Sequence, residues 1–291
     1  MTALALLLVL VSSVAHASWN LLAKRGSNQE VFIWWSQTAI GVLMLPLGAL
    51  LFWKFPVDGT GWWFVVGTVL LHIFYFLFLA RGYAKADLSV VYPIARGMGP
   101  TLAPLLAVSI LGESVSPLAI VGIVSVVVGI YTVYWWGSFG QIFSDPLKLL
   151  KESGTRYAVF TGFLIASYSI WDKVGVGHVT PFLYMYLMSV GTAIGMAPYL
   201  IRAHGMTAIR YELKINRLGI VGVAVLSFLA YGLVLTALTF SQVSYIAPSR
   251  EIGIVVGVLL GTLVLKEPFG GGRLLGAGLI AAGPVIITLA P

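Results

Sequence analysis

The sequence predicts an all-α polytopic membrane protein in which ten transmembrane helices form two inverted repeats of five helices each. Composition is the first observation: of 291 residues, 59% are hydrophobic and 9% are charged. Soluble domains carry about 45–50% apolar and about 25% charged residues, so a soluble fold is excluded. The second observation is that the apolar residues form ten long runs, and the third is that the second half of the chain repeats the first.

Each of the ten runs contains about 20 mostly apolar residues, the length that a helix needs to cross a bilayer. The runs are continuously apolar rather than alternating, which favours helices over a barrel. They cover residues 3–23, 31–53, 62–80, 88–111, 116–136, 157–174, 180–201, 217–239, 244–265 and 270–290. Because the connections between them are short, any function must lie inside the membrane.

The first run has a second interpretation as a secretory signal, because it leads to Ala15-His16-Ala17, a small-x-small pattern. A signal peptide also needs a positively charged start, which is missing here. Apolar residues resume at Leu21 and Leu22 before the first basic pair. We therefore expect a permanent span, with cleavage as the alternative.

A polar stretch at 137–156 separates spans five and six, and it predicts a cytoplasmic linker with a short interfacial helix. The linker divides the chain into a first repeat at 1–136 and a second repeat at 157–291. Shifting the sequence by 154 residues superposes five pairs: Arg96 on Arg250, Gly99 on Gly253, Glu113 on Glu267, Gly122 on Gly276 and Gly129 on Gly283. A shift of 152 superposes Trp19 on Trp171 and Asn20 on Asp172.

An odd number of spans in each unit means that the second copy enters the membrane from the opposite side, as in many secondary transporters. Basic residues then set the orientation. Thirteen of the 17 lie in connections after odd-numbered spans, and only Lys54 and Lys173 follow even-numbered ones. The positive-inside rule predicts a protein of the cytoplasmic (inner) membrane with both termini on the outer side.

Few polar groups lie at membrane depth, where each ionised side chain costs about 2.5–3.5 kcal/mol at a helix centre. They are His16, Asn20, His72, Arg96, Asp172, Gln242, Arg250 and Glu251. The predicted topology puts Asn20 and Arg96 in the cytoplasmic half and Asp172 and Arg250 in the outer half. We therefore expect two polar clusters, one on each side of the midplane.

Arg96 and Arg250 are the central candidates for substrate binding or gating. We expect them to present positive charge to a substrate carboxylate or to hold gate contacts, with Arg250 paired to Asp172. The alternative is that both arginines only cap helix breaks. His16 and His72 are candidate proton carriers, because histidine titrates near neutral pH; the alternative for each is a hydrogen-bonded packing role.

Prolines interrupt spans four and nine near these arginines: Pro93, Pro100 and Pro104 in one and Pro248 in the other. Proline frees backbone carbonyls, so broken helices at matching places in two halves indicate a transporter site. Aromatic side chains surround these breaks and extend the candidate site by Trp19, Tyr75, Tyr83, Tyr92, Trp171 and Tyr245. Such rings suit an amphipathic molecule of amino-acid size, and core packing is the alternative for each.

Other functional classes have little support. Zero cysteines exclude disulfides and thiolate metal sites, and four isolated histidines predict no metal centre. The basic residues are scattered between apolar runs, which is not the pattern of a nucleic-acid-binding face. No H-E-x-x-H or G-x-S-x-G motif occurs, so we expect no enzyme and no cofactor. Glu113 and Glu267 each precede a helix and are predicted to be structural caps.

Each repeat ends in a similar pattern, P-I-A-R-G-M-G-P…L-G-E-S-V-S…G-I-V-S-V-V-V-G at 93–129 and P-S-R-E-I-G…L-K-E-P-F…G-A-G-L-I-A-A-G at 248–283. These patterns resemble the EamA repeat of the drug/metabolite transporter superfamily over essentially the whole chain. The resemblance implies a ten-helix transporter whose central cavity is lined by helices one to four and six to nine.

Within that superfamily the chain looks most similar to exporters of amino acids, including aromatic ones. The resemblance therefore implies a secondary transporter of small organic metabolites that works by alternating access and exports its substrate. Its expected partners are the substrate and the lipid bilayer, and we expect a monomer. Carriers of drugs, organic cations or sugar phosphates share the fold and stay as alternatives, as does an intramembrane enzyme from a different class.

Overall fold

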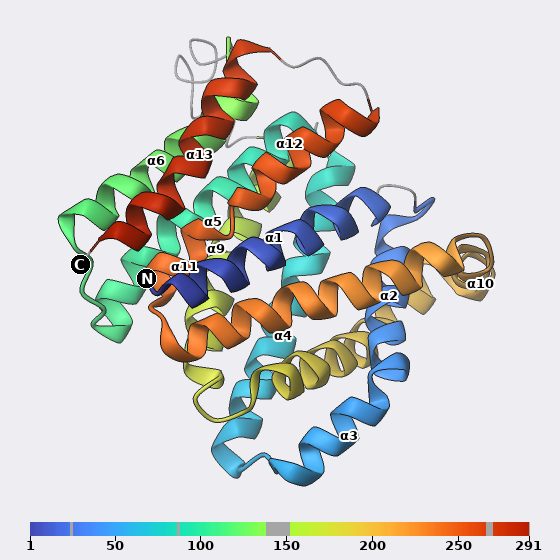
Figure 1. The fold of residues 1–291 in the computed structure, drawn as a ribbon. Helices are drawn as coiled ribbons and strands as arrows, with labels where there is room; N and C mark the ends of the chain where they lie inside the picture. Colours follow the sequence, from blue (N-terminus) through green and yellow to red (C-terminus); the bar gives the residue numbers. More distant parts are fainter. Residues whose placement is uncertain (24–25, 86–87, 138–151, 266–269, 291) are drawn as a thin grey trace.

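The computed structural model describes residues 1–23, 26–85, 88–137, 152–265 and 270–290, and in these ranges the chain is helical without any strand (Figure 1). The helices are α1 (Ala3–Ala23), α2 (Gln29–Leu43), α3 (Leu45–Lys54), α4 (Gly59–Lys85), α5 (Leu88–Leu111), α6 (Pro117–Trp135), α9 (Ser153–Gly175), α10 (Pro181–Phe240), α11 (Val243–Ser249), α12 (Ile252–Leu265) and α13 (Gly271–Leu289). They confirm the all-helical class and correspond to the ten predicted spans. Residues 138–151 of the expected linker helix lie outside the described residues.

Two of the predicted spans are interrupted and two others are joined in one helix, each for a local reason. Span two bends by 58° between α2 and α3, where a proline at the start of α3 removes a backbone donor. Helix α10 contains spans seven and eight, which separate at Gly205, whose φ of +73° is disfavoured for residues with a Cβ. Span nine divides into α11 and α12 just after Pro248.

Length and apolarity alone mark six helices as able to cross a membrane, and the bent pair α2 and α3 makes seven. Helix α10 counts once in that number although it holds two spans. Helix α9 and the divided span nine complete the ten. Helix α9 carries buried Thr161, Ser169 and Asp172, so its polarity reflects interior contacts rather than exposure to water.

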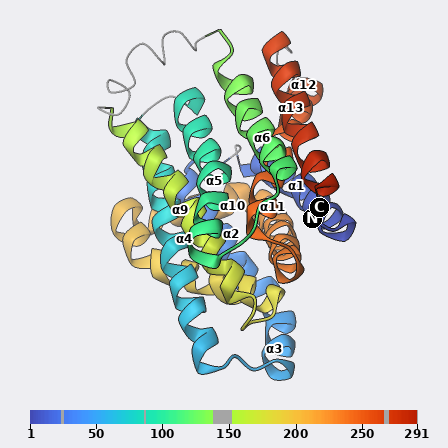
Figure 2. The ribbon, with the colours of Figure 1, turned by 90° about the vertical axis from the view of Figure 1, so that its left-hand side faces the viewer.

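Helices α6 and α13 cross closely and show the symmetry of the molecule (Figure 2). A Cβ on Gly122 would lie 2.8 Å from the carbonyl oxygen of Gly283, and one on Gly129 would lie 2.8 Å from that of Gly276. Ser125 donates to the carbonyl of Leu279 at 2.9 Å, and these two residues are themselves 154 positions apart. Matching residues therefore meet crosswise along antiparallel helices, as a two-fold axis between inverted repeats requires.

The first helix of each repeat packs into the other repeat. Helix α9 lies against α4 and α5 of the first repeat, and α1 lies against α12 and the second half of α10. The small residues of spans four and nine permit this approach, since Gly99 faces Ile165 of α9 and Gly253 faces Ser13 of α1. Two helix groups result, which we call group A (α4, α5 and α9) and group B (α1, the second half of α10 and α12). Helix α11 packs mainly on α5.

One end of the bundle holds both termini together with the connections that follow even-numbered spans. Met1 packs there near Val115 and Ala290. Glu113 accepts hydrogen bonds from the backbone amides of Val243 and Ser244, both at 2.9 Å. Glu113 is thus structural as predicted, but it caps α11 of the other repeat; the helix that follows it, α6, is capped by Ser116.

The opposite end holds connections that follow odd-numbered spans. Buried Glu212 accepts from the backbone amides of Ser27 and Asn28 at 3.2 and 3.0 Å and from Asn216 at 2.7 Å. Next to it, His204 lies 2.7 Å from Glu30. The connections therefore alternate between the two ends, as the predicted topology requires. Which end faces the cytoplasm stays a prediction.

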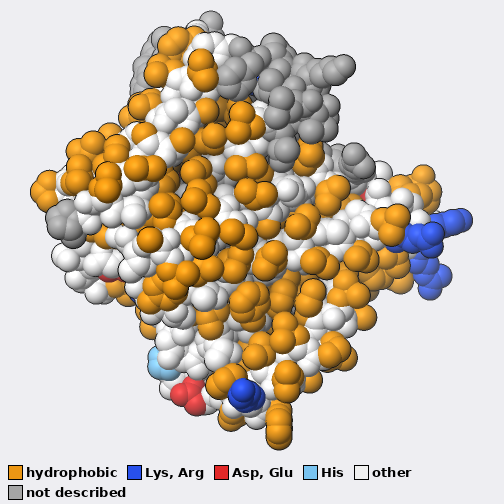
Figure 3. Space-filling view, viewed as in Figure 1, with side chains coloured by type: hydrophobic (Ala, Val, Ile, Leu, Met, Phe, Trp, Pro, Cys, Tyr) orange, Lys and Arg blue, Asp and Glu red, His pale blue; other side chains and the backbone are white. Residues whose placement is uncertain are grey.

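The lateral surface is apolar, as expected of a lipid-facing protein. Hydrophobic side chains cover most of the visible face in Figure 3, and Lys and Arg gather at its right-hand edge beside α10. Trp53 and Trp63 are 82% and 75% exposed at the ends of their helices, where tryptophan favours the membrane interface.

The close crossing of α6 and α13 gives a stability prediction with a matched control. Gly276→Ala would place a Cβ 2.7 Å from the Gly129 carbonyl oxygen, whereas Gly278→Ala on the same helix meets nothing within 4 Å. Overpacking of this kind costs about 1–3 kcal/mol, so we expect Gly276→Ala to lower the thermal unfolding midpoint in detergent. Gly278→Ala should leave it unchanged or raise it. Equal thermal unfolding midpoints for the two variants would contradict the close contact between α6 and α13.

Candidate functional site

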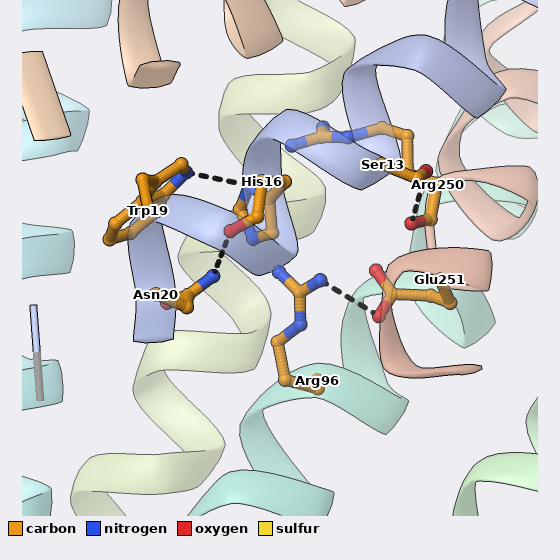
Figure 4. Close-up of polar contacts among 7 residues, drawn as sticks. All are labelled: Ser13, His16, Trp19, Asn20, Arg96, Arg250 and Glu251. Carbon is orange, nitrogen blue, oxygen red and sulfur yellow. Dashed lines mark hydrogen bonds and ion pairs between the residues drawn. The ribbon is translucent and has the colours of Figure 1, made fainter. Parts of the chain in front are cut away.

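A buried ion pair joins the two repeats near the middle of the bundle. Arg96 projects from α5 between two prolines, and its Nη2 lies 3.0 Å from Oε2 of Glu251, which stands at the break between α11 and α12 (Figure 4). The two side chains are 11% and 5% exposed. A charge at this depth needs a partner, and the other repeat supplies it. The sequence indicates both residues but not their pairing.

Arg250 caps the end of α11 and lies beside aromatic rings. Its guanidinium carbon is 5.3 Å from the ring centre of Tyr231, within the range of a cation–π contact. Its backbone carbonyl accepts from Ser13 at 3.3 Å. Within the part of the chain that the structure describes, Arg250 forms no ion pair with Asp172. That expected pair is absent because hydroxyl groups of tyrosines occupy the Asp172 oxygens instead.

His16 of α1 lies between the two arginines, and both guanidinium groups point toward it in Figure 4. Trp19 Nε1 donates to His16 Nδ1 at 3.2 Å, so the ring nitrogen Nδ1 must be an acceptor and carries no proton. Asn20 donates to the His16 carbonyl at 2.8 Å. These three predicted residues therefore form one local network on α1 and hold the imidazole in place.

A second polar group lies around Asp172 on α9. Tyr184 donates to its Oδ1 at 2.9 Å, and Tyr231 donates to its Oδ2 in a shorter bond. His72 of α4 stacks on Tyr168 with ring centres 4.5 Å apart and meets Tyr231 edge-on at 5.7 Å.

The predicted Tyr75 completes this aromatic group. Its ring centre lies 5.7 Å from that of Tyr168 and 6.2 Å from that of His72. Both contacts are edge-on, a favourable geometry for ring pairs. Tyr75 therefore lines the Asp172 side of the site.

Tyr231 connects the two groups, because it contacts both Arg250 and Asp172. The sequence predicts two separate clusters, but the structure shows one continuous polar layer. Tyr168, Tyr184 and Tyr231 are not among the predicted site residues. The repeat contains a signal for the first of them: the shift of 152 that pairs Asn20 with Asp172 also pairs His16 with Tyr168.

The layer is asymmetric although the scaffold is symmetric. Both repeats supply an arginine, Arg96 and Arg250, at matching positions. The two acidic residues come from the second repeat alone: Asp172 stands where the first has Asn20, and Glu251 where the first has a glycine. The equivalent halves of the layer therefore differ in charge, and Arg96 depends on a carboxylate from the other repeat.

Two predicted aromatics lie elsewhere. Trp171 is 36% exposed, donates to the Phe64 carbonyl at 2.9 Å and fills the space beside Gly67. Tyr245 packs at the end of the bundle that holds the termini, and its hydroxyl accepts from the Ser116 amide at 3.4 Å. Both side chains therefore have packing partners away from the polar layer. The side chains of Tyr83 and Tyr92 lie outside the described residues.

The layer can bind ions and dipoles. Guanidinium groups suit carboxylates through paired hydrogen bonds, and the tyrosine and histidine rings suit an apolar or aromatic body. Among the described residues, no group of three or more His, Asp or Glu side chains could hold a metal ion.

The chain is similar to known proteins in sequence and in fold. A comparison with curated proteins gives no match. One solved structure, titled "Crystal structure of protein", is 15% identical and superposes with a TM-score of 0.74 over 99% of this chain and 97% of that one; this likeness concerns the fold. The model of the EamA-like transporter family matches residues 3–135 and again 153–289. Since the two matches cover nearly the whole chain, this multi-pass membrane protein belongs to the EamA-like transporter family.

Proposed function

We propose that the protein is a secondary transporter that exports amino acids, including aromatic ones, across the cytoplasmic membrane by alternating access. The observation that carries this proposal is the placement of Arg250. Its guanidinium is held against a tyrosine ring, inside the membrane, without an acidic partner among the described residues. A carboxylate on the substrate would provide the partner that a charge at this depth requires.

The surroundings of Arg250 fit an amino acid better than the alternatives. Two arginines face His16, so an organic cation would meet charge of its own sign. A sugar phosphate carries more negative charge than one unpaired guanidinium balances. The rings of Tyr168, Tyr231 and His72 offer a surface for an aromatic or apolar side chain.

The described contacts support a state in which the end with the termini is closed. Two side chains of group A reach group B on that side: Asp172 contacts Tyr231, and Lys173 donates to the carbonyls of Leu238 and Ser241 at 2.6 and 2.9 Å. Glu113 of the α5–α6 connection holds the start of α11 there. We call these contacts the outer gate. With the outer gate closed, the polar layer would be loaded from the opposite side, which suits export.

We further propose that the termini and the outer gate face the outside of the cell. The support is the distribution of basic residues, which lie mostly in the connections at the opposite end. The two repeats, proposed at 1–136 and 157–291, would rearrange about the polar layer in a monomer.

A test of the carboxylate site uses Arg250→Gln. Removing a charged hydrogen-bond donor costs about 1.5–3 kcal/mol, so we expect KM for an amino acid to rise roughly 10-fold to 100-fold in proteoliposome counterflow. The KM for the corresponding amino-acid amide should change little. The KM of Arg250→Lys for the amino acid should lie between those of the wild-type protein and Arg250→Gln. Exposed Arg202→Gln is the charge-matched control. Wild-type KM in Arg250→Gln, at normal protein amount, would disprove the carboxylate role.

The ion pair makes a separate prediction about stability. Removing one partner of a buried pair costs about 3–5 kcal/mol, because the other charge is left buried. We therefore expect Glu251→Gln to lower the thermal midpoint more than the double variant Arg96→Gln/Glu251→Gln does. Additive losses in the double variant would show that the pair carries no coupling energy.

Orientation can be tested by cysteine labelling, because the chain has no natural cysteine. Thr60→Cys, exposed at the end with the termini, should react with a membrane-impermeant maleimide in intact cells. Arg210→Cys, exposed at the opposite end, should react only after permeabilisation. The reverse pattern would invert the proposed topology.

A further inference from the structure

Asp172 is the most deeply buried acidic side chain in the polar layer, with no exposed surface. Each of its oxygens meets a tyrosine hydroxyl, Oδ1 that of Tyr184 and Oδ2 that of Tyr231. A hydroxyl can either donate or accept a hydrogen bond. These contacts therefore serve a neutral carboxylic acid as well as a carboxylate, and they do not fix its charge.

No cation contacts this carboxyl group in the described chain. The adjacent Lys173 turns its ammonium to the carbonyls of Leu238 and Ser241, and Arg250 lies over the ring of Tyr231. The titratable and charged groups that surround Asp172 are His72 and Tyr75 on α4, Tyr168 and Lys173 on α9, Tyr184 and Tyr231 on α10, and Arg250 at the end of α11.

His72 is the one base in this set that is neither a lysine nor an arginine. It is 5% exposed and shares Tyr231 as a neighbour with Asp172. Its Nδ1 lies 2.9 Å from the Thr68 carbonyl, so Nδ1 carries a hydrogen. Its second ring nitrogen can take up a proton, and the imidazolium would then sit beside the acid.

A buried carboxylate without a compensating positive charge is strongly unfavourable. In the closed arrangement, one proton on either Asp172 or His72 removes that cost. When the carboxyl group and the imidazole are in contact with water at neutral pH, neither group needs the proton. Because the two groups are close, the proton belongs to the pair rather than to one residue.

We propose that Asp172 and His72 together form a proton-binding site that takes up one proton when the outer gate closes and releases it to the outer water when the gate opens. Asp172 belongs to group A and Tyr231 to group B, so separating the groups breaks their hydrogen bond and hydrates the carboxyl group. The bound proton then controls how often the outer gate of the transporter proposed above opens, and the inference rests on that function.

The test measures gate opening without a substrate. Ser244→Cys introduces a thiol at a fully buried position beside the outer gate. We measure how fast an impermeant maleimide labels this thiol and divide that rate by the labelling rate of exposed Thr60→Cys at the same pH. The ratio reports the fraction of molecules with an open outer gate, because the division removes the effect of pH on thiol ionisation. The closed state binds one more proton, so low pH favours closure. The hydrated imidazole of the open state loses its proton above about pH 6.5. We therefore expect the ratio to rise from about pH 6.5 to about pH 8, at most tenfold for each pH unit.

Variants identify the proton site. Asp172→Asn, whose side chain is neutral at every pH, should abolish the parental rise of the ratio with pH. His72→Gln leaves Asp172 in place. The labelling ratio of this variant should still depend on pH, but its pH profile should be shifted from that of the parent. Asp58→Asn is the matched control, because this exposed aspartate caps Gly61 away from the layer, and its profile should match the parent's.

The outcomes separate this inference from the proposed function. A flat profile in the parent protein, or a parental slope in Asp172→Asn, would overturn the proton site even where the Arg250 predictions hold. If Asp172→Asn fails to fold, an unshifted profile in His72→Gln would overturn the shared site. A parental slope that Asp172→Asn abolishes would support the site even where no amino acid is transported.

Discussion

The cost of placing charge in a membrane governs the rest of this structure. Four ionisable side chains, Arg96, Asp172, Arg250 and Glu251, lie at depths where water cannot reach them freely. All four turn to the region between the two repeats, where they meet each other or tyrosine side chains. The lipid-facing surface stays apolar as a result, and in the described chain these four charged groups gather in the polar layer.

The inverted repeat builds that layer by exchanging its first helices. Because α9 packs on α4 and α5, and α1 packs on α12 and α10, each helix group contains a helix from the other repeat. Under the proposed alternating access, movement of one group against the other would open the layer to one side and close it to the other. Helices α6 and α13 join through glycine contacts away from the layer, which suits a fixed scaffold. The symmetry is a property of the scaffold, while the unequal acids make the two sides of the layer chemically different.

The helix breaks have a functional consequence. Pro248 precedes a tight turn between α11 and α12, and the two oppositely charged neighbours Arg250 and Glu251 project from this hydrogen-bonded turn. Here Glu251 reaches Arg96 and Arg250 reaches Tyr231. The break thus allows one short segment to serve both the ion pair and the aromatic group.

The sequence by itself determined the ten spans, the breaks, the duplication and its inversion, because these depend on the length of apolar runs, on proline and glycine, and on the spacing of matching residues. It also identified both arginines and Glu251 as members of the layer. Only the tertiary structure decided that Arg96 pairs with Glu251, that tyrosines and not Arg250 hold Asp172, and that Glu113 caps α11. These partners are 12 to 155 residues apart in the chain, and hydropathy does not define how each helix is rotated about its own axis. That rotation, set by packing between helices, decides which side chains meet.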